Sequence, residues 1–242
     1  MQQDDVFGEA FQTYMEDGDC EPIMVWLDHE EQPLLDVGYF FRSFDEMPEL
    51  EQTALNLCGD KVLDIGAAAG CHSQHLLDQG KEIHSLEISP GACNVLRNRG
   101  LPNVIQGDFL SIEVEEQFDT LLFLMNGLGM GKDAEGTLAL LKKAKGLLKP
   151  GGQILGDTSD ISYFREPETK KRGLTSQSSF VHYYGKVHFL TKWRTFESCF
   201  DWIYPDPQLL EHLAAKTGLR AELIQNGPHY DYLYRFTIDD NQ

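Results

Sequence analysis

The stretch that decides the fold is KVLDIGAAAGCH, residues 61–72. It opens with an apolar run, 62–65, that contains one acid, Asp64, and then turns through Gly66 and Gly70 into a helical pattern. A strand, a turn of small residues and a helix in this order are typical of nucleotide-type binding units. Small residues let the backbone approach a ligand, and glycine adopts positive φ without steric cost. The stretch therefore predicts a ligand site at the end of a strand.

Strands and helices alternate regularly after this point. We expect strands at 61–65, 82–87, 103–106, 118–125 and 153–157, and helices at 71–79, 90–99 and 133–147. Such alternation predicts an α/β protein with parallel pairing, right-handed crossovers and a doubly wound sheet. A helix at 207–217 and two antiparallel strands at 220–225 and 232–238 complete the pattern.

Two regions depart from this rhythm. Residues 1–44 read as an acidic N-terminal extension or cap, with a helix at 7–17 and a hairpin of 23–28 with 33–37; a further helix follows at 47–58. The main domain, 45–242, contains an antiparallel β insert at about 160–204. Within the insert we expect a polar loop at 165–179, a hairpin of 181–184 with 187–192, and a third strand at 195–204.

The charge balance limits the classes of partner. The net charge is −19, and residues 1–60 hold 16 acids and one base, Arg42. Binding to phosphate backbones depends on Lys and Arg, so nucleic acid and anionic membranes are disfavoured. The acidic N-terminus predicts either a solvated face that aids solubility or a surface that attracts a cationic substrate.

Targeting and cysteine signals predict a cytoplasmic protein. No apolar run reaches the roughly 18 residues of a membrane helix, and the start MQQDDVFGEA lacks the pattern of a signal peptide. The five cysteines are scattered and form no CxxC pair. We therefore expect reduced thiols, with neither a disulfide framework nor a zinc site.

Five segments in order carry a resemblance to a known family. They are VLDIGAAAG (62–70), Glu87 at the end of HSLE, GDF (107–109), FDTLL (118–122) and LKPGG (148–152). Over about residues 45–238 this order resembles the class I S-adenosylmethionine-dependent methyltransferases. The resemblance implies a mostly parallel seven-stranded sheet of order 3-2-1-4-5-7-6, with S-adenosylmethionine as the cofactor.

The resemblance also implies a set of cofactor contacts at the carboxyl ends of the strands. Asp64 and the backbone after strand 118–125 would hold the ammonium, Glu87 the ribose hydroxyls, and the GDF segment the adenine. The cofactor-binding residues expected are Asp64, Gly66, Ala67, Ala68, Gly70, Glu87, Ile88, Asp108, Phe109, Met125 and Asn126. Asp119, which starts its strand, is left out as a structural residue.

Ala68 departs from the family pattern, and NAD is the rival cofactor. Ala68 stands where the family usually has a glycine, and we expect its methyl to be tolerated if its φ is negative. NAD would need the fingerprint GxGxxG, whereas the chain has Gly66, Ala68 and Cys71 at those positions. The GDF and LKPGG segments also have no place in that fingerprint, so the sequence favours S-adenosylmethionine.

Methyl transfer is an in-line displacement that alignment and desolvation can accelerate, so no fixed triad is required. A base is needed only if the acceptor must lose a proton. The candidates are His182, Tyr183, Tyr184, His188 and His229, although for each of them a packed or surface role is more usual than catalysis. Asp157 and Asp160 are too few to indicate a metal, and we predict none. No catalytic residue is assigned.

The leading hypothesis is methyl transfer to a small-molecule acceptor near residues 126–129. The rival is a non-catalytic S-adenosylmethionine-binding or protein-interaction module. The segment 39–42 and the insert aromatics either roof the cofactor or form a core between the insert and the sheet. These aromatics are Tyr183, Tyr184, Trp193, Trp202 and Tyr204. The pattern assigns neither the acceptor atom nor an oligomeric state.

Overall fold

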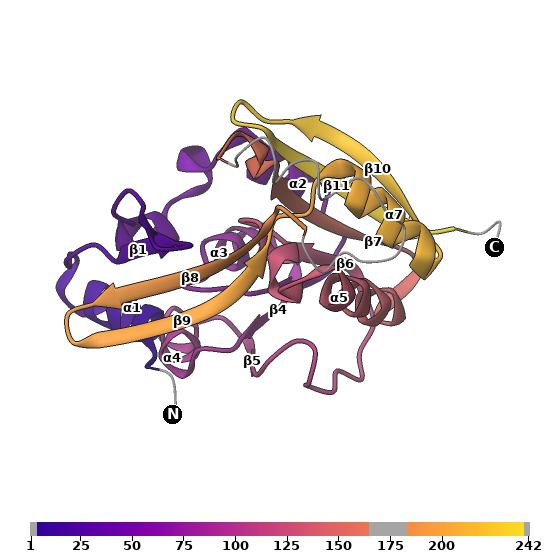
Figure 1. Ribbon diagram of the computed structural model, residues 1–242. Coiled ribbons are helices and arrows are strands. Elements are labelled where there is room, and N and C mark those ends of the chain that lie inside the picture. The colour runs from indigo at the N-terminus through magenta and orange to yellow at the C-terminus, as the bar shows by residue number, and fades with distance from the viewer. Residues whose placement is uncertain (1–3, 165–182, 240–242) are drawn as a thin grey trace.

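A seven-stranded sheet forms the centre of the computed structural model, which describes residues 4–164 and 183–239 (Figure 1). The strand order is β10-β11-β7-β6-β3-β4-β5. The bounds are β3 (Lys61–Ile65), β4 (Glu82–Glu87), β5 (Asn103–Gln106), β6 (Phe118–Phe123), β7 (Leu148–Ser159), β10 (Leu219–Asn226) and β11 (Asp231–Ile238). The strands from β5 to β7 run parallel, while β11 is antiparallel to both β7 and β10. The predicted order 3-2-1-4-5-7-6 is confirmed.

Helices cover both faces of this sheet. They are α2 (Glu49–Leu57), α3 (Cys71–Asp78), α4 (Pro90–Asn98), α5 (Ala134–Gly146) and α7 (Pro207–Thr217). Successive side chains of a strand point to opposite faces, so Val62 packs in the apolar cluster of α2 and Leu63 in that of α5. The helices and strands predicted for the seven-stranded sheet and its covering helices are all present, with shifts of up to five residues at their ends. In the parts of the chain that the structure describes, no helix is long and apolar enough to cross a membrane.

A second sheet joins the N-terminal segment to the insert. Its order is β2-β1-β8-β9, from β1 (Met24–Leu27), β2 (Glu30–Glu31), β8 (Lys186–Trp193) and β9 (Phe196–Ile203). β1 pairs antiparallel with β8, although more than 150 residues separate the two strands in sequence. Figure 1 shows the long β8–β9 ribbon reaching toward β1 and α1 (Val6–Asp17). The predicted antiparallel insert is present, but it is one half of a sheet shared with the N-terminus.

In these two regions the predicted hairpins were wrong, because the strands that pair are not the predicted ones. The first turns at Asp28 and His29, both with positive φ, so β2 lies at 30–31, while residues 33–37 contribute one bridge, from Leu35 to Ile23. In the insert, β8 pairs with β9 across Arg194, whose φ is 53°. Residues 181 and 182 and the expected loop 165–179 lie outside the described residues. The third predicted strand, 195–204, is thus the partner of β8.

The N-terminal helix α1 is anchored on the start of α4, just after the carboxyl end of β4. The Asp5 carboxylate accepts hydrogen bonds from the Gly8 and Gly91 N–H groups and from the Ser89 hydroxyl, and so caps both α1 and α4. A Cβ built on Gly91 would lie 2.6 Å from the Gly8 Cα, so the two helices meet through their glycines. The 3-10 turn η1 (Val37–Phe41) and Trp193 share one apolar cluster with α1. We call segment 4–44 together with β8 and β9 the cap.

Candidate functional site

The turn after β3 has the close geometry that its small residues predict. Gly66 and Gly70 have φ values of 77° and 85°, and the N–H groups of Gly66 and Ala67 both donate to the Leu86 carbonyl. A Cβ at Gly70 would lie 2.6 Å from Leu96, so glycine is required there for two reasons. The turn thereby brings the start of α3 close to the carboxyl ends of β3 and β4.

Ala68 does not meet the condition stated for it. Its φ is 50°, in the left-handed region, where a Cβ costs roughly 1–2 kcal/mol. Its N–H donates to Glu87 Oε2 at 2.8 Å, which holds the peptide in this conformation. The methyl group is therefore accommodated with strain, and the turn keeps the conformation that a glycine would adopt at this position.

Glu87 lies at the carboxyl end of β4, as the sequence indicates. Its Oε1 accepts the Ile88 and Ser89 N–H groups at 2.7 and 2.9 Å, in addition to the Ala68 bond to Oε2. Burial raises the pKa of Glu87, although these backbone hydrogen bonds oppose the shift. The carboxylate is thus fixed beside the turn, with room on Oε2 for a further donor. The Ile88 side chain, by contrast, is 65% exposed.

Asp64 and Asp108 have local partners as well. Asp64 is buried and accepts the Ser73 hydroxyl at 2.6 Å, which ties β3 to α3; burial raises its pKa. Asp108 is exposed and accepts the Leu110 N–H at 2.9 Å, while Phe109 packs into the core at right angles to Phe123. Their roles toward the cofactor ammonium and adenine stay predictions.

The end of β6 is strained and linked to β7. Met125 and Asn126 are consecutive residues with positive φ, 57° and 60°, a conformation that costs of order 1–3 kcal/mol per residue. The Asn126 N–H donates to Asp157 Oδ1 at 2.8 Å, and its side-chain oxygen accepts the Ser159 hydroxyl at 3.0 Å. Strain of this kind is typical of functional sites. Here the hydrogen bond from Asn126 to Asp157 joins the end of β6 to β7.

Asp157 is a buried acid near the end of β7 that the sequence suggested only as a possible metal ligand, and not as part of the cofactor or acceptor site. Burial raises its pKa to about 7, and the hydrogen bond from Asn126 opposes that shift only in part. The side chain is 9% exposed. The charges of Glu51 in α2 and His72 in α3 also act on its pKa, which Glu51 raises and His72 lowers.

The second missed feature is a buried ionic cluster of Arg42, Glu51 and His72. Glu51 Oε2 accepts from Arg42 Nη2 and lies 2.6 Å from His72 Nε2, and all three side chains are at least nine-tenths buried. Burial opposes ionisation, but the hydrogen bond from His72 and the neighbouring positive charges keep the pKa of Glu51 below its usual value. Burial by itself would lower the pKa of His72. Interactions with Cys71, Glu51 and Asp64 outweigh it and raise this pKa well above its usual range. The three side chains therefore form one buried, hydrogen-bonded unit that joins segment 4–44 to α2 and α3.

The base candidates of the insert have other partners. The Tyr183 hydroxyl accepts from the Asp206 N–H, and the Tyr184 hydroxyl donates to the Asp206 carboxylate. Burial raises the pKa of both tyrosines. His188 is exposed and pairs with Asp201, and His229 is exposed in the β10–β11 turn. His182 lies outside the described residues. None of the four described candidates is therefore poised as a base beside the cofactor turn.

The insert aromatics divide between two roles. Trp193 belongs to the apolar cluster of the cap, and its indole N–H donates to the Glu21 carbonyl at 2.8 Å. A Cβ at Gly129 in η3 (Gly127–Gly131) would overlap Trp202, so β9 packs directly on the turn after β6. Part of the insert is thus core, and part covers the expected acceptor region.

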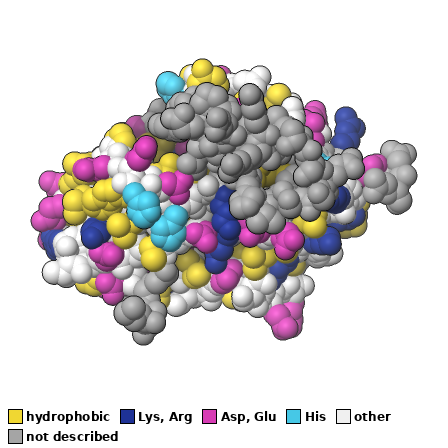
Figure 2. Space-filling view, in the orientation of Figure 1, with side chains coloured by type: hydrophobic (Ala, Val, Ile, Leu, Met, Phe, Trp, Pro, Cys, Tyr) yellow, Lys and Arg dark blue, Asp and Glu magenta, His cyan; other side chains and the backbone are white. Residues whose placement is uncertain are grey.

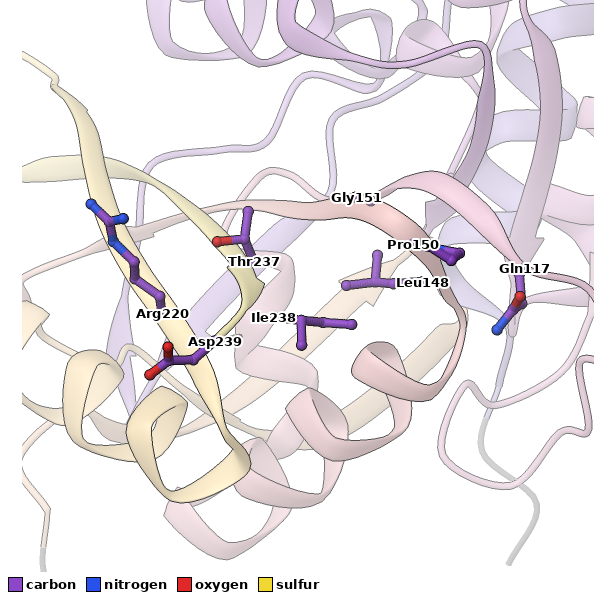
Figure 3. A pocket seen from close by; sticks show the side chains of 9 residues that line it. Gln117, Leu148, Pro150, Gly151, Arg220, Thr237, Ile238 and Asp239 are labelled. Carbon is purple, nitrogen blue, oxygen red and sulfur yellow. The ribbon is translucent and has the colours of Figure 1, made fainter. Parts of the chain in front are cut away.

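The opposite end of the sheet, where the parallel strands begin, holds a cavity and a charged group. The cavity, of about 750 Å³, is lined by Leu148, Arg220 and Ile238 among others (Figure 3). It lies at the start of β7 and the end of the antiparallel β11, whereas the cofactor turn follows the carboxyl end of β3. This cavity is therefore not the cofactor site.

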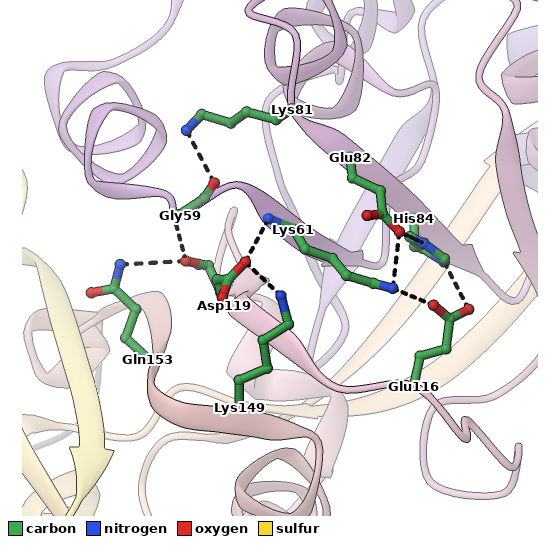
Figure 4. Close-up of polar contacts among 10 residues, drawn as sticks. Gly59, Lys61, Lys81, Glu82, His84, Glu116, Asp119, Lys149 and Gln153 are labelled. Atoms are coloured by element: carbon green, nitrogen blue, oxygen red, sulfur yellow. Dashed lines mark hydrogen bonds and ion pairs between the residues drawn. The ribbon is translucent and has the colours of Figure 1, made fainter.

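The charged group beside it is structural. The Lys61 ammonium pairs with both Glu82 and Glu116, next to His84 (Figure 4). Glu82, His84 and Glu116 offer metal-ligand atoms within 4.8 Å of one another, but the Lys61 ammonium already supplies the cation between the carboxylates. Asp119 accepts from the Lys61 N–H and the Lys149 ammonium, both at 2.9 Å, which fits its exclusion from the site.

Comparisons with known proteins agree with this geometry. A family of sequences described as "Methyltransferase domain" matches residues 62–152. The crystal structure of an S-adenosylmethionine-dependent methyltransferase from Bacteroides fragilis, in complex with S-adenosyl-L-homocysteine, superposes with a TM-score of 0.87 at 35% identity. The match covers 97% of this chain and 95% of that one. The chain belongs to the S-adenosylmethionine-dependent methyltransferases.

The cofactor of this methyltransferase is S-adenosylmethionine, and the residues present fit it. The small-residue turn admits a close ligand, Glu87 is fixed for hydroxyl groups, and one buried polar atom, Arg42 Nε, has no hydrogen-bond partner among the described residues. This chain does not have the NAD fingerprint.

Two curated relatives match over shorter stretches. A cypemycin N-terminal methyltransferase from Streptomyces is 27% identical over 122 residues, which cover 49% of this chain and 50% of the relative. A ubiquinone biosynthesis O-methyltransferase from Xanthomonas euvesicatoria is 27% identical over 117 residues, covering 46% and 47%. The chain thus spans about half the length of the curated relatives it matches.

Proposed function

We propose that this methyltransferase acts on a small-molecule acceptor held between the carboxyl ends of β6 and β7 and the cap. The observation that carries the proposal is the buried Asp157 carboxyl beside Asn126. In the reaction, a lone pair of the acceptor forms a bond to the methyl carbon while the carbon–sulfur bond breaks and leaves S-adenosylhomocysteine. An amine or hydroxyl acceptor must lose a proton, and a carboxyl whose pKa is near neutrality is suited to take it.

The surroundings of Asp157 support a small acceptor rather than a polymer. Trp202 covers the turn after β6, which leaves the acceptor side under the cap and not on an open surface. On the face shown in Figure 2, basic side chains are scattered among acidic ones and form no continuous basic surface over the described residues. The name of one curated relative, a ubiquinone biosynthesis O-methyltransferase, also supports a small-molecule acceptor.

The test is transfer of labelled methyl from S-adenosylmethionine to a panel of small amines, phenols and carboxylates, with protein extract as a separate arm. We expect turnover of at least one small molecule. Asp157→Asn keeps an oxygen for the Asn126 N–H but cannot take a proton, so it should lose about 100-fold or more in kcat. Asp119→Asn, at the start of β6 and so at the opposite end of the same sheet, is the matched control and should retain turnover.

Two results would contradict the proposal. The first is methylation confined to the protein extract, which would point to a macromolecular acceptor. The second is full turnover of a small molecule by Asp157→Asn, which would leave the acceptor class intact but remove Asp157 from the reaction.

A further inference from the structure

The β8–β9 ribbon of the cap has one charged face and one uncharged face. Successive residues of a strand point to opposite faces, and the pairing of the two strands sets Phe189 opposite Phe200 and Val187 opposite Trp202. We call the face that these four residues share the inner face; it carries only Val, Phe, Thr, Trp and Ser side chains along both strands. The charged side chains of the two strands all lie on the other face. They are Lys186, Lys192, Glu197 and Asp201.

One end of the inner face lies on the turn that follows β6. A Cβ built on Gly129 in η3 would overlap the Trp202 indole, so the strand and the turn are in direct contact. The next residue of η3, Met130, reaches the cofactor turn, where its Sδ lies 3.6 Å from a Cβ built on Gly66. The inner face is therefore anchored at the place where η3 meets the cofactor turn.

Three aromatic rings continue the inner face from this point. Phe189 packs against both the apolar cluster that contains Leu128 of η3 and the one that contains Ala69 of the cofactor turn. Its ring stacks on that of Phe200, with 5.2 Å between the centroids and 24° between the planes. Phe200 in turn meets Trp202 edge to face, at 5.8 Å and 68°. The three rings thus form one wall between η3 and the cofactor turn.

We propose that the wall of Phe189, Phe200 and Trp202 binds an aromatic ring of the acceptor, so that this methyltransferase selects small molecules whose accepting atom is attached close to such a ring. Phe200 carries the argument. It is half-buried on the inner face, yet among the described residues it belongs to none of the three apolar clusters, unlike Phe189 and Trp202, which pack against them. A large apolar ring that faces inward and is left partly uncovered favours an apolar ligand. An aromatic ligand gains more, because paired rings attract one another beyond the area they bury.

The charges around the wall favour a neutral ring. An anionic ring would have to leave water for an inner face that offers no cation on β8 or β9, which is costly. Asn126, which precedes η3 directly, holds the buried carboxyl of Asp157 through its N–H. The wall and this carboxyl therefore adjoin the same turn, the first suited to the ring of the acceptor and the second to its reacting group.

Phe196 provides a matched control on the same strand and the same face. It lies four residues from Phe200, and its ring stacks on Trp193 with 6.2 Å between the centroids. It packs against the apolar cluster of the cap that includes Phe11 of α1. If loss of any inner-face ring disturbed the acceptor site through the sheet, Phe196 and Phe200 would behave alike.

The test measures, by chemical-shift titration with S-adenosylhomocysteine present, the Kd of benzyl alcohol and of cyclohexylmethanol. The two probes share the hydroxymethyl group and differ in whether the ring is aromatic. We expect the wild type to bind benzyl alcohol about 3- to 10-fold more tightly. In Phe200→Leu the two Kd values should agree within about twofold, while Phe196→Leu should keep the wild-type ratio. Benzoate, the anionic probe, should bind the wild type at least about tenfold more weakly than benzyl alcohol.

Rescue separates loss of the ring from damage to the strand. Phe200→Tyr keeps an aromatic ring and should retain the wild-type ratio, and Phe200→Ile, whose branched side chain suits a strand, replaces the leucine variant if that variant does not fold. A wild-type ratio near one, binding of neither alcohol, or an unchanged ratio after loss of the Phe200 ring would each overturn the proposal.

The inference rests on the acceptor site proposed above, and the two can fail separately. Turnover of small aliphatic amines or alcohols in preference to their aromatic counterparts would refute the aromatic wall and leave the small-molecule acceptor in place. Methylation confined to the protein extract would refute the proposed function, whatever the ratio of the two Kd values.

Discussion

The buried carboxyl of Asp157 makes the stability of this protein depend on pH in a direction that can be calculated. Burial raises its pKa from the ordinary value of 3.8 to about 7. Between these values the unfolded chain is ionised while the folded chain keeps the proton, so the group stabilises the fold at low pH. That stability is lost as the pH rises to about 7, at roughly 1.4 kcal/mol per pH unit. From pH 5.5 to pH 8 the loss is therefore about 2 kcal/mol.

Asp157→Asn removes this term while keeping an oxygen for the Asn126 N–H. Urea unfolding of the wild type and the variant at pH 5.5 and pH 8 gives the free energy of unfolding of each. The difference between the two proteins should move by about 2 kcal/mol in favour of the variant at the higher pH. Groups that titrate in this window independently of Asp157 are common to both proteins and cancel.

The matched control for this prediction is Asp119→Asn. The hydrogen bond from Lys149 holds the pKa of Asp119 below its usual value, so its contribution is constant above pH 5.5. The wild type and this variant should therefore differ equally at both pH values. A difference between wild type and Asp157→Asn that moves by less than about 0.5 kcal/mol would refute the assignment of a near-neutral pKa to Asp157.

Three further substitutions test the packing of the site. Ala68→Gly should be neutral or stabilising by up to about 1 kcal/mol in urea unfolding, because it relieves a left-handed alanine; a clear destabilisation would show that the methyl group packs favourably. Gly129→Ala should collide with Trp202 and expose β8–β9 to limited proteolysis while the circular dichroism of the main domain persists. Gly91→Ala should push α1 away at Gly8 and speed amide exchange in α1; unchanged protection would contradict the close helix contact.

The sequence predicted the main sheet well because residues close together in the chain specify each of its strands and helices. Val62 and Leu63 point to opposite faces of a strand buried on both sides, and a run of apolar residues reports this directly. Gly218 ends α7 with a φ of 68°, and Pro207 begins the helix, as the helix signals in the sequence indicate. Each of these elements is specified by neighbours a few residues away.

The cap could not be predicted in the same way. Its insert hairpin turns at Arg194, which adopts positive φ, whereas the sequence offers Gly185 as the more usual turn residue. The pairing of β1 with β8 depends on two segments far apart in sequence, for which no local pattern exists. The same limit applies to Glu51 and His72, since only the fold reveals that Glu51 in α2 and His72 in α3 meet.

The acidic N-terminus is more than a solvated face, since several of its acids hold the cap together. Asp5 caps α1 and α4, Asp28 accepts the His188 N–H in β8, and Asp4 accepts the Glu197 N–H in β9. A carboxylate that accepts backbone N–H groups of a distant segment fixes how that segment lies, which a surface charge does not. These three acids therefore serve the docking of the cap. The one base in that region, Arg42, lies where the cap meets the cofactor turn.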